Sequence, residues 1–344
     1  MTTAATTDNP SSPSSTPASS GFVTDLDLIA KHKRRRTVAT LVMVGAVLAL
    51  VVTGGIFVPE FLSPANLLSV LRAASITGVV AIGLTFVTIS GNYFSLSVAQ
   101  TAILSTVVYA TAASAGGFLT GLLAVAAVCL IIGLIQGLVV GAGGNPIVVT
   151  LATGAVLLAI VLVVTGGKRV RLLPPDGDTL ALFGQSSPLG IPVATWAFVL
   201  LAIVCHLLLK KTTLGRRTVL LGANKDTARS IGYNVRWIIA IVFLVASLTA
   251  GIAGVLTAAE FGVADASQFT SLDVDAIAAV LVGGTAIRGG QGSILQTTIG
   301  VVFIALLNNL LQILGLSTGI RLSLVGGAVV VAVLAYSLMK ERSR

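Results

Sequence analysis

The 344-residue sequence has few charged side chains, few aromatic side chains and almost no cysteine. Charged residues make up 10% of the chain and aromatic residues 5%, and the two cysteines, Cys129 and Cys205, both lie within apolar runs. A disulfide framework or a cysteine-based zinc site is therefore not expected. The sequence also lacks the G-x-x-x-x-G-K-[ST] phosphate-binding loop and any pairing of a nucleophile with a base. We expect neither enzymatic activity nor a metal or cofactor bound by this chain.

The residues that are abundant are apolar. Hydrophobic residues make up 55% of the chain, and the mean hydropathy is +1.02. About 20 apolar residues are needed to cross about 30 Å of hydrocarbon, and the chain has many such runs. The sequence predicts an all-α, polytopic membrane protein with about ten transmembrane helices, some of them broken or re-entrant. The expected spans are 38–58, 67–89, 96–113, a segment ending near 143, 146–165, 193–209, 237–259, a short one at 276–282, 294–314 and 322–338.

The positive charge is distributed as in a membrane protein. The net charge of +9 comes from cations in loops beside apolar runs, which is the positive-inside bias rather than a basic face for nucleic acid. Residues 1–37 are rich in Ser, Thr and Pro and predict a disordered cytosolic tail, while 38–344 form the transmembrane domain. Six spans then bring the loop 210–236 to the cytosolic side, and four more bring the C-terminus there. The cations at 168–171 oppose this assignment because it leaves them outside.

The polar segment 222–235 predicts a short capped helix. Asn224 suits the N-cap, Asp226 suits the positively polarised first turn, and Gly232 suits the left-handed position at the end. About two turns of helix are not stable alone in water, so the segment must pack against its own domain or a partner. An ordinary connecting loop and a docking element both remain open on this evidence.

Four segments of this sequence resemble the permease subunits of sugar-type ATP-binding cassette (ABC) importers. They begin at Thr213 (TLGRRTVLLGANKDTARSIGYNV), Asp275 (DAIAAVLVGGTAIRGGQGS), Asn145 and Phe61, and together they cover most of residues 61–315 in the right order. The matching positions in the first segment are Gly215, Arg216, Arg217, Gly222, Asn224, Ala228, Arg229, Gly232, Asn234 and Val235.

The resemblance implies a permease that forms the path for a monosaccharide or similar polar solute in a prokaryotic cell membrane. Its implied partners are two cytosolic ATPases that use ATP, a second permease subunit in a homo- or heterodimer, and an extracytoplasmic binding protein. The segment 222–235 would be the coupling helix, where Ala228 allows close approach to an ATPase and Lys225 or Arg229 pairs with its acidic residues. The implied coupling residues are Gly222, Asn224, Lys225, Ala228, Arg229 and Gly232.

The sequence departs from the family pattern after its second span. The family usually has Gly-Gly-Ile-Asp-Leu-Ser-Val-Gly, whereas here Ser95 stands in place of the Asp and Ala99 in place of the last Gly. Asp273 stands where a Glu often precedes Ile-Ala-Ala-Val. Losing a carboxylate from the membrane changes the hydrogen bonds available to a solute. We therefore expect either a solute other than ribose or one member of a heterodimeric pair.

Polar residues in apolar surroundings are the candidates for the solute path. Asn92, Tyr93, Ser95 and Ser97 lie at a glycine-interrupted break, where unwound backbone can line a cavity. Asn308 lies within the ninth span and either lines the path or bonds a neighbouring helix. A branched-chain amino-acid or nucleoside ABC permease is an alternative with the same architecture. A secondary transporter or channel, which needs no ATPase, is a further alternative.

Overall fold

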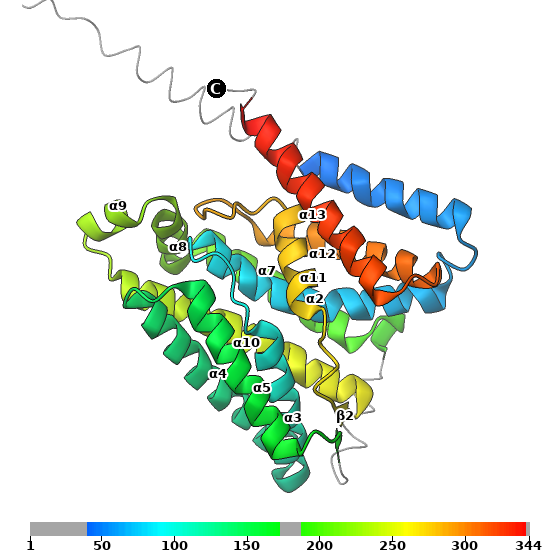
Figure 1. Cartoon of the computed structure of the whole chain (residues 1–344), viewed down its shortest axis with the longest axis horizontal. Helices are drawn as coiled ribbons and strands as arrows, with labels where there is room; N and C mark the ends of the chain where they lie inside the picture. The colour runs from blue at the N-terminus through cyan, green and yellow to red at the C-terminus, as the bar shows by residue number, and fades with distance from the viewer. Residues whose placement is uncertain (1–39, 173–186, 342–344) are drawn as a thin grey trace, which may run out of the picture. The chain divides into compact units, whose positions relative to one another are not determined.

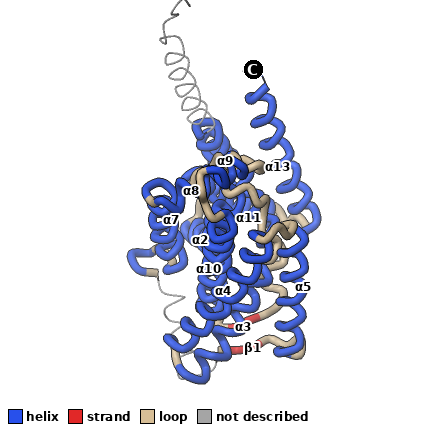
Figure 2. The backbone as a smooth tube through the Cα atoms, turned by 90° about the vertical axis from the view of Figure 1, so that its left-hand side faces the viewer, coloured by secondary structure: helices blue, strands red, loops and turns tan. Residues whose placement is uncertain are grey.

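A computed structural model describes residues 40–172 and 187–341. The expected N-terminal tail lies outside this part of the chain. Almost all the regular structure within it is helical (Figures 1 and 2). Two strands of two residues each, β1 (Val170–Arg171) and β2 (Val263–Ala264), pair antiparallel. The prediction of an all-α membrane protein is confirmed.

Eight helices in the described residues are long and apolar enough to cross a membrane. They are Thr40–Phe57, α2 (Pro64–Ile89), α3 (Val98–Gly116), α4 (Phe118–Gly141), α5 (Pro146–Thr165), α7 (Val193–Lys211), α10 (Val235–Phe261) and α12 (Ile294–Ile313). The chain then ends with α13 (Thr318–Glu341), whose first fourteen residues are also apolar. Between α10 and α12 lies α11 (Leu272–Val282). Its 11 residues reach about 16 Å, roughly half of a bilayer core.

Local capping explains where two of the spans begin. Ser63 accepts from the backbone N–H of Asn66 and precedes a proline at the first helical position, so α2 begins three residues before the expected start at 67. Asn145 caps α5 in the same way, again followed by a proline, and this helix has the expected bounds. Proline is favoured at this position because its missing N–H would have no partner there.

The centre of the membrane domain is α10, which packs against α2, α3 and α4. Glycines of α4 permit the closest of these contacts. A Cβ on Gly133 would lie 2.6 Å from the Cα of Leu244, and one on Gly137 would meet the backbone of Ala240. Small residues four apart let two membrane helices approach closely, because van der Waals packing rather than the hydrophobic effect drives helix association in lipid. By contrast, α4, α5 and α7 expose many large apolar side chains, as lipid-facing helices do.

The polar elements lie at opposite ends of this domain (Figure 2). One end carries α8 (Thr213–Ala223) and α9 (Lys225–Ser230), and the other carries β1 and β2. At the strand end, Arg169 forms an ion pair with Asp265 at 2.6 Å. The pKa of Asp265 is lowered from its ordinary value, mainly because the backbone N–H and hydroxyl of Ser267 donate to it and secondarily because of Arg169.

Candidate translocation and coupling site

The segment between α7 and α10 forms two helices rather than one. The expected capped helix is α9, and its caps are those that the sequence predicts. The side-chain oxygen of Asn224 accepts from the backbone N–H groups of Asp226 and Thr227, both at 3.0 Å. Gly232 has φ +83° and donates to the carbonyl of Arg229, so the helix ends in a left-handed turn. The preceding helix, α8, is not expected from the sequence.

The orientation of α9 buries Ala228. Its side chain is fully buried within this chain and belongs to the apolar core, so it does not offer a surface for close approach by another protein. The exposed side chains of α9 include Lys225 and Arg229. An interface at α9 would therefore use these charged groups, and the small side chain at 228 is needed for packing of the helix onto its own domain.

The end of α8 makes backbone contact with two membrane elements at Gly222. A Cβ at this position would meet the carbonyl oxygen of Ile89, which ends α2, and would lie 2.6 Å from the backbone nitrogen of Gly290. That nitrogen donates to the carbonyl of Ile89 at 2.8 Å. Gly290 belongs to the glycine-rich loop between α11 and α12. The α8–α9 segment, the end of α2 and this loop therefore form one close contact that only a glycine at 222 permits.

The break after α2 is held in place by hydrogen bonds from other helices. Ser97 is 1% exposed, and its hydroxyl accepts from the side-chain amide of Gln136 in α4 at 2.8 Å. The hydroxyl of Ser95 lies 3.1 Å from that of Ser97. Asn92 is buried and donates to Ser90, whereas Tyr93 is 47% exposed with φ +57°, a strained conformation for a bulky residue. The break is a fixed, non-helical element whose polar groups are largely paired.

A carboxylate does lie at this break, although Ser95 stands where the resemblance implies an aspartate. Asp273, in the first turn of α11, accepts from the backbone N–H of Ala99 at 2.9 Å. Ser97 makes no capping bond with its own side chain, so Asp273 caps α3 from another helix. A negative charge is favoured at this position because the N-terminal end of a helix carries a partial positive charge.

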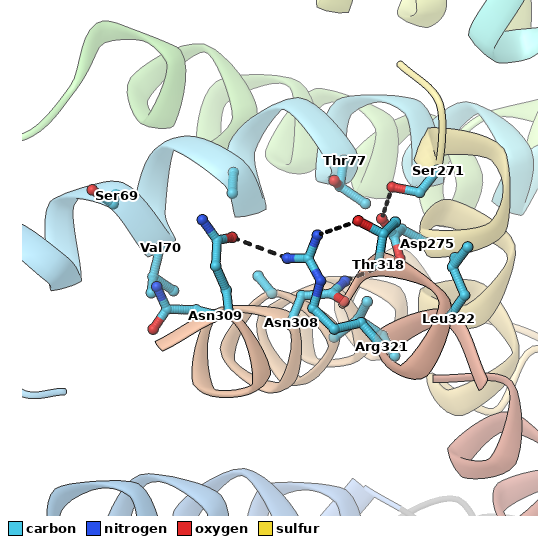
Figure 3. Close-up of a pocket in the computed structure, with 14 residues that line it drawn as sticks. Ser69, Val70, Thr77, Ser271, Asp275, Asn308, Asn309, Thr318, Arg321 and Leu322 are labelled. Carbon is cyan, nitrogen blue, oxygen red and sulfur yellow. Dashed lines mark hydrogen bonds between the residues drawn. The ribbon is translucent and has the colours of Figure 1, made fainter. Parts of the chain in front are cut away.

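A polar pocket of about 330 Å³ lies among α2, α11, α12 and α13. Asn308 donates to Asp275 at 3.0 Å, and Ser271 donates to the other oxygen of the same carboxylate (Figure 3). Arg321 of α13 donates to Gln312 of α12 at 3.1 Å. The remaining lining residues are Ser69, Val70, Ala73, Thr77, Ile304, Ala305, Asn309, Thr318 and Leu322.

The structure thus separates the expected path residues into two groups. Asn92, Tyr93, Ser95 and Ser97 lie at the break, and Asn308 lies at the pocket. Its neighbour Asn309 forms a reciprocal amide pair with Asn66 of α2, at 2.9 and 2.7 Å.

The charged residues of the pocket, Asp275 and Arg321, were not among the residues predicted to line the solute path. Each is an ionisable residue beside or within an apolar segment, and such residues are costly in a membrane and mark functional sites. That rule alone would have identified both residues as candidates for the solute path. Their contacts with Asn308 and Gln312 could not be foreseen, because they join different helices.

A bundle of apolar helices with a short half-membrane helix, an ordered break, an internal polar pocket and a capped polar segment at one end has the features of a transport protein. Residues 66–334 match the family described as branched-chain amino acid transport system / permease component. The chain belongs to this family, whose members are permease subunits of ABC importers rather than enzymes. This confirms the resemblance found in the sequence.

Several similar proteins are sugar import permeases. The chain is 36% identical over 292 residues to the ribose import permease protein RbsC of Bacillus subtilis (strain 168), which covers 83% of this chain and 88% of that protein. It is 32% identical over 295 residues to RbsC of Escherichia coli (strain K12), covering 84% and 91%. It is 31% identical over 292 residues to the D-allose transport system permease protein AlsC of E. coli (strain K12), covering 83% and 88%. No solved structure gives a significant match.

Proposed function

We propose that this chain forms the membrane path for a monosaccharide in an ABC importer, and that separate ATPases drive it through α8 and α9. Sugar import by the similar permeases supports the solute class. The observation that carries the coupling role is the backbone contact at Gly222, because it links the polar α8–α9 segment directly to two membrane elements. An ordinary connecting loop has no need of such a contact.

The partners follow from the family and from the charge on α9. Two ATPases would bind the cytosolic ends of two permease subunits, and a binding protein would deliver solute at the opposite end. Lys225 and Arg229 are exposed and are suited to pair with acidic groups of an ATPase. In this proposal α8, α9 and both chain termini lie on the cytosolic side of a prokaryotic cell membrane.

The transmission would run along α11. A push on α9 moves α8, and Gly222 carries that movement to the end of α2 and to the loop at Gly290. This loop leads back to α11, whose other end holds Asp273 at the break and Asp275 at the pocket. Because a packed core is stiff, a displacement at one end of this short helix reaches both polar regions.

A charge-reversal experiment tests the coupling role. Lys225→Glu with Arg229→Glu should abolish co-purification of the partner ATPase, while leaving the permease in the membrane. Lys168→Glu with Arg171→Glu makes the same change of charge at exposed positions on the opposite end and serves as the matched control. If the α9 double variant recovers as much ATPase as the control double variant and the unmodified chain, α9 is ruled out as the docking element.

A branched-chain amino-acid permease remains the second candidate, because the family description names that solute class. Uptake assays with labelled ribose and labelled leucine, in cells that contain the cognate ATPase and binding protein, decide between the two. The secondary-transporter alternative is disfavoured by membership of an ABC permease family. It would gain support only from uptake driven by an ion gradient without the ATPase.

A further inference from the structure

The pocket among α2, α11, α12 and α13 has the chemistry of a solute site. Nine of its fourteen lining residues carry a polar side chain, and they come from four separate elements. A volume of about 330 Å³ lies at the lower end of the range of about 300–1,000 Å³ for ligand pockets. A small hydrated solute therefore fits, and a larger oligosaccharide does not.

The position of the pocket suits solute entry from outside. Ser69 and Val70 lie near the beginning of α2, Gln312 lies at the end of α12, and Thr318 begins α13. The α8–α9 segment contacts the opposite end of α2 and the loop before α12. The pocket consequently lies in the half of the membrane domain away from the coupling segment.

The groups in the pocket favour a neutral solute with several hydroxyls. It contains one acid, Asp275, and one base, Arg321, so its formal charge balances. An ionised carboxylate has about four acceptor sites, and Ser271 and Asn308 use two of those on Asp275. Arg321 donates from one terminal nitrogen to Gln312 and from the other to Thr318, and each of these nitrogens has a second N–H to offer. Both acceptors, on Asp275, and donors, on Arg321, thus remain available in the pocket.

Hydroxyl groups can bond to Asp275 and Arg321 at once, because each hydroxyl donates one hydrogen bond and accepts others. Among the described residues that line the pocket, none has an aromatic side chain that could hold a sugar ring by stacking. Affinity should accordingly be modest, as a transit site requires, since a solute must be able to leave as well as enter.

We propose that this pocket is the outward-facing solute site and that it selects neutral polyhydroxylated solutes, with Asp275 accepting from and Arg321 donating to their hydroxyls. This proposal rests on the proposed function, because it names the solute class and entry site of the same permease.

Thiol protection tests it on the full-length chain in lipid nanodiscs. Both native cysteines are buried and can be replaced by alanine, and Ser69→Cys then places one exposed thiol at the pocket. A membrane-impermeant maleimide should label this thiol more slowly in the presence of D-ribose, D-allose or D-xylose, but not of leucine or gluconate. At about ten times the Kd, occupancy should slow labelling about tenfold. Ser267→Cys, an exposed loop residue outside the pocket, should label at the same rate with and without sugar.

A second variant tests the role of the carboxylate. Asp275→Asn in the Ser69→Cys chain should raise the sugar concentration needed for half-protection by about tenfold or more, because hydrogen bonds to a charged group are the stronger ones. Thr298→Val, on α12 but outside the pocket, should leave it unchanged. If Asp275→Asn fails to fold, the proposal is still tested by comparing protection by sugars with protection by leucine in the Ser69→Cys chain.

Two results would overturn the proposal: protection by leucine or gluconate alone, or no protection by any sugar. Either can occur while the ATPase still binds through α9, and in that case the solute site is wrong and the coupling role stands. If only the α9 variants lose ATPase binding and sugars protect the thiol at the pocket, both the coupling role of α9 and the solute site are supported.

Discussion

Substituting alanine for Gly222 isolates the contact between the coupling segment and the membrane domain. The new methyl would meet the carbonyl oxygen of Ile89 and lie 2.6 Å from the nitrogen of Gly290, both of them backbone atoms that no rotamer change can move. Overpacking of this kind costs about 1–3 kcal/mol. Alanine is otherwise better than glycine in a helix by about 1 kcal/mol, so any loss of function must come from the contact itself.

The expected effect is on coupling and not on assembly. A penalty of about 2 kcal/mol on the state in which α8 packs against α2 lowers its population about thirtyfold. Solute uptake by the assembled transporter should therefore fall at least tenfold, while ATPase co-purification through the unchanged surface of α9 persists. Uptake with purified ATPase and binding protein in proteoliposomes, together with ATP hydrolysis in the same vesicles, measures both.

Gly326→Ala in α13 is the matched control, because a Cβ there meets no atom within 4 Å. It should leave both uptake and hydrolysis unchanged. Wild-type uptake by Gly222→Ala, with Gly326→Ala also normal, would refute the idea that this contact transmits movement. Equal loss in both variants would indicate a general effect of the substitution.

Three further predictions concern polar groups within the membrane domain. Asp273→Ala removes the cap on α3 and should lower the free energy of unfolding by about 0.5–2 kcal/mol, whereas Asp273→Asn keeps an acceptor and should cost less; denaturation in detergent compares them. A double-mutant cycle of Asn66→Leu and Asn309→Leu should give a coupling energy near 0.6 and below about 1.7 kcal/mol, and a value of zero would mean that the amide pair does not stabilise the fold. Ser95→Asp restores the family's usual acid but adds a second carboxylate at the N-terminal end of α3, so uptake should fall. Adding Asp273→Asn to that variant should restore uptake, and failure of this rescue would show that the two charges do not interact.

The sequence was sufficient where structure is decided locally. The cap at Asn224 and the left-handed turn at Gly232 could be predicted because each depends on one residue's own bonding or backbone preference. The bounds of α5 followed from an Asn-Pro start and a Gly-Gly end. Apolar length alone also revealed that α11 is too short to span, since it ends at adjacent glycines.

Where structure depends on packing, the sequence was insufficient. The direction of Ala228 follows from how α9 lies on its own domain, so its burial could not be predicted from the local sequence. The helix α8 was not predicted because it is amphipathic: its apolar side chains form one stripe, and its other faces are polar. Such a segment is not apolar enough to be recognised as a membrane span. The pocket joins Asp275 to Asn308, 33 residues away, and no local pattern contains that information.

The two acidic residues of α11 explain why a half-length helix would be useful here. Each residue of an α-helix is rotated by about 100° from the one before it, so residues two apart point to nearly opposite sides of the helix. Asp273 accordingly bonds the start of α3, and Asp275 bonds α12 and lines the pocket. A full-length span would be anchored at both membrane surfaces, whereas α11 is held at one end by these two bonds and at the other by the glycine loop against α8. Movement of α8 would then alter the break and the pocket together, so access to the solute site and release toward the cytosol would change in one step.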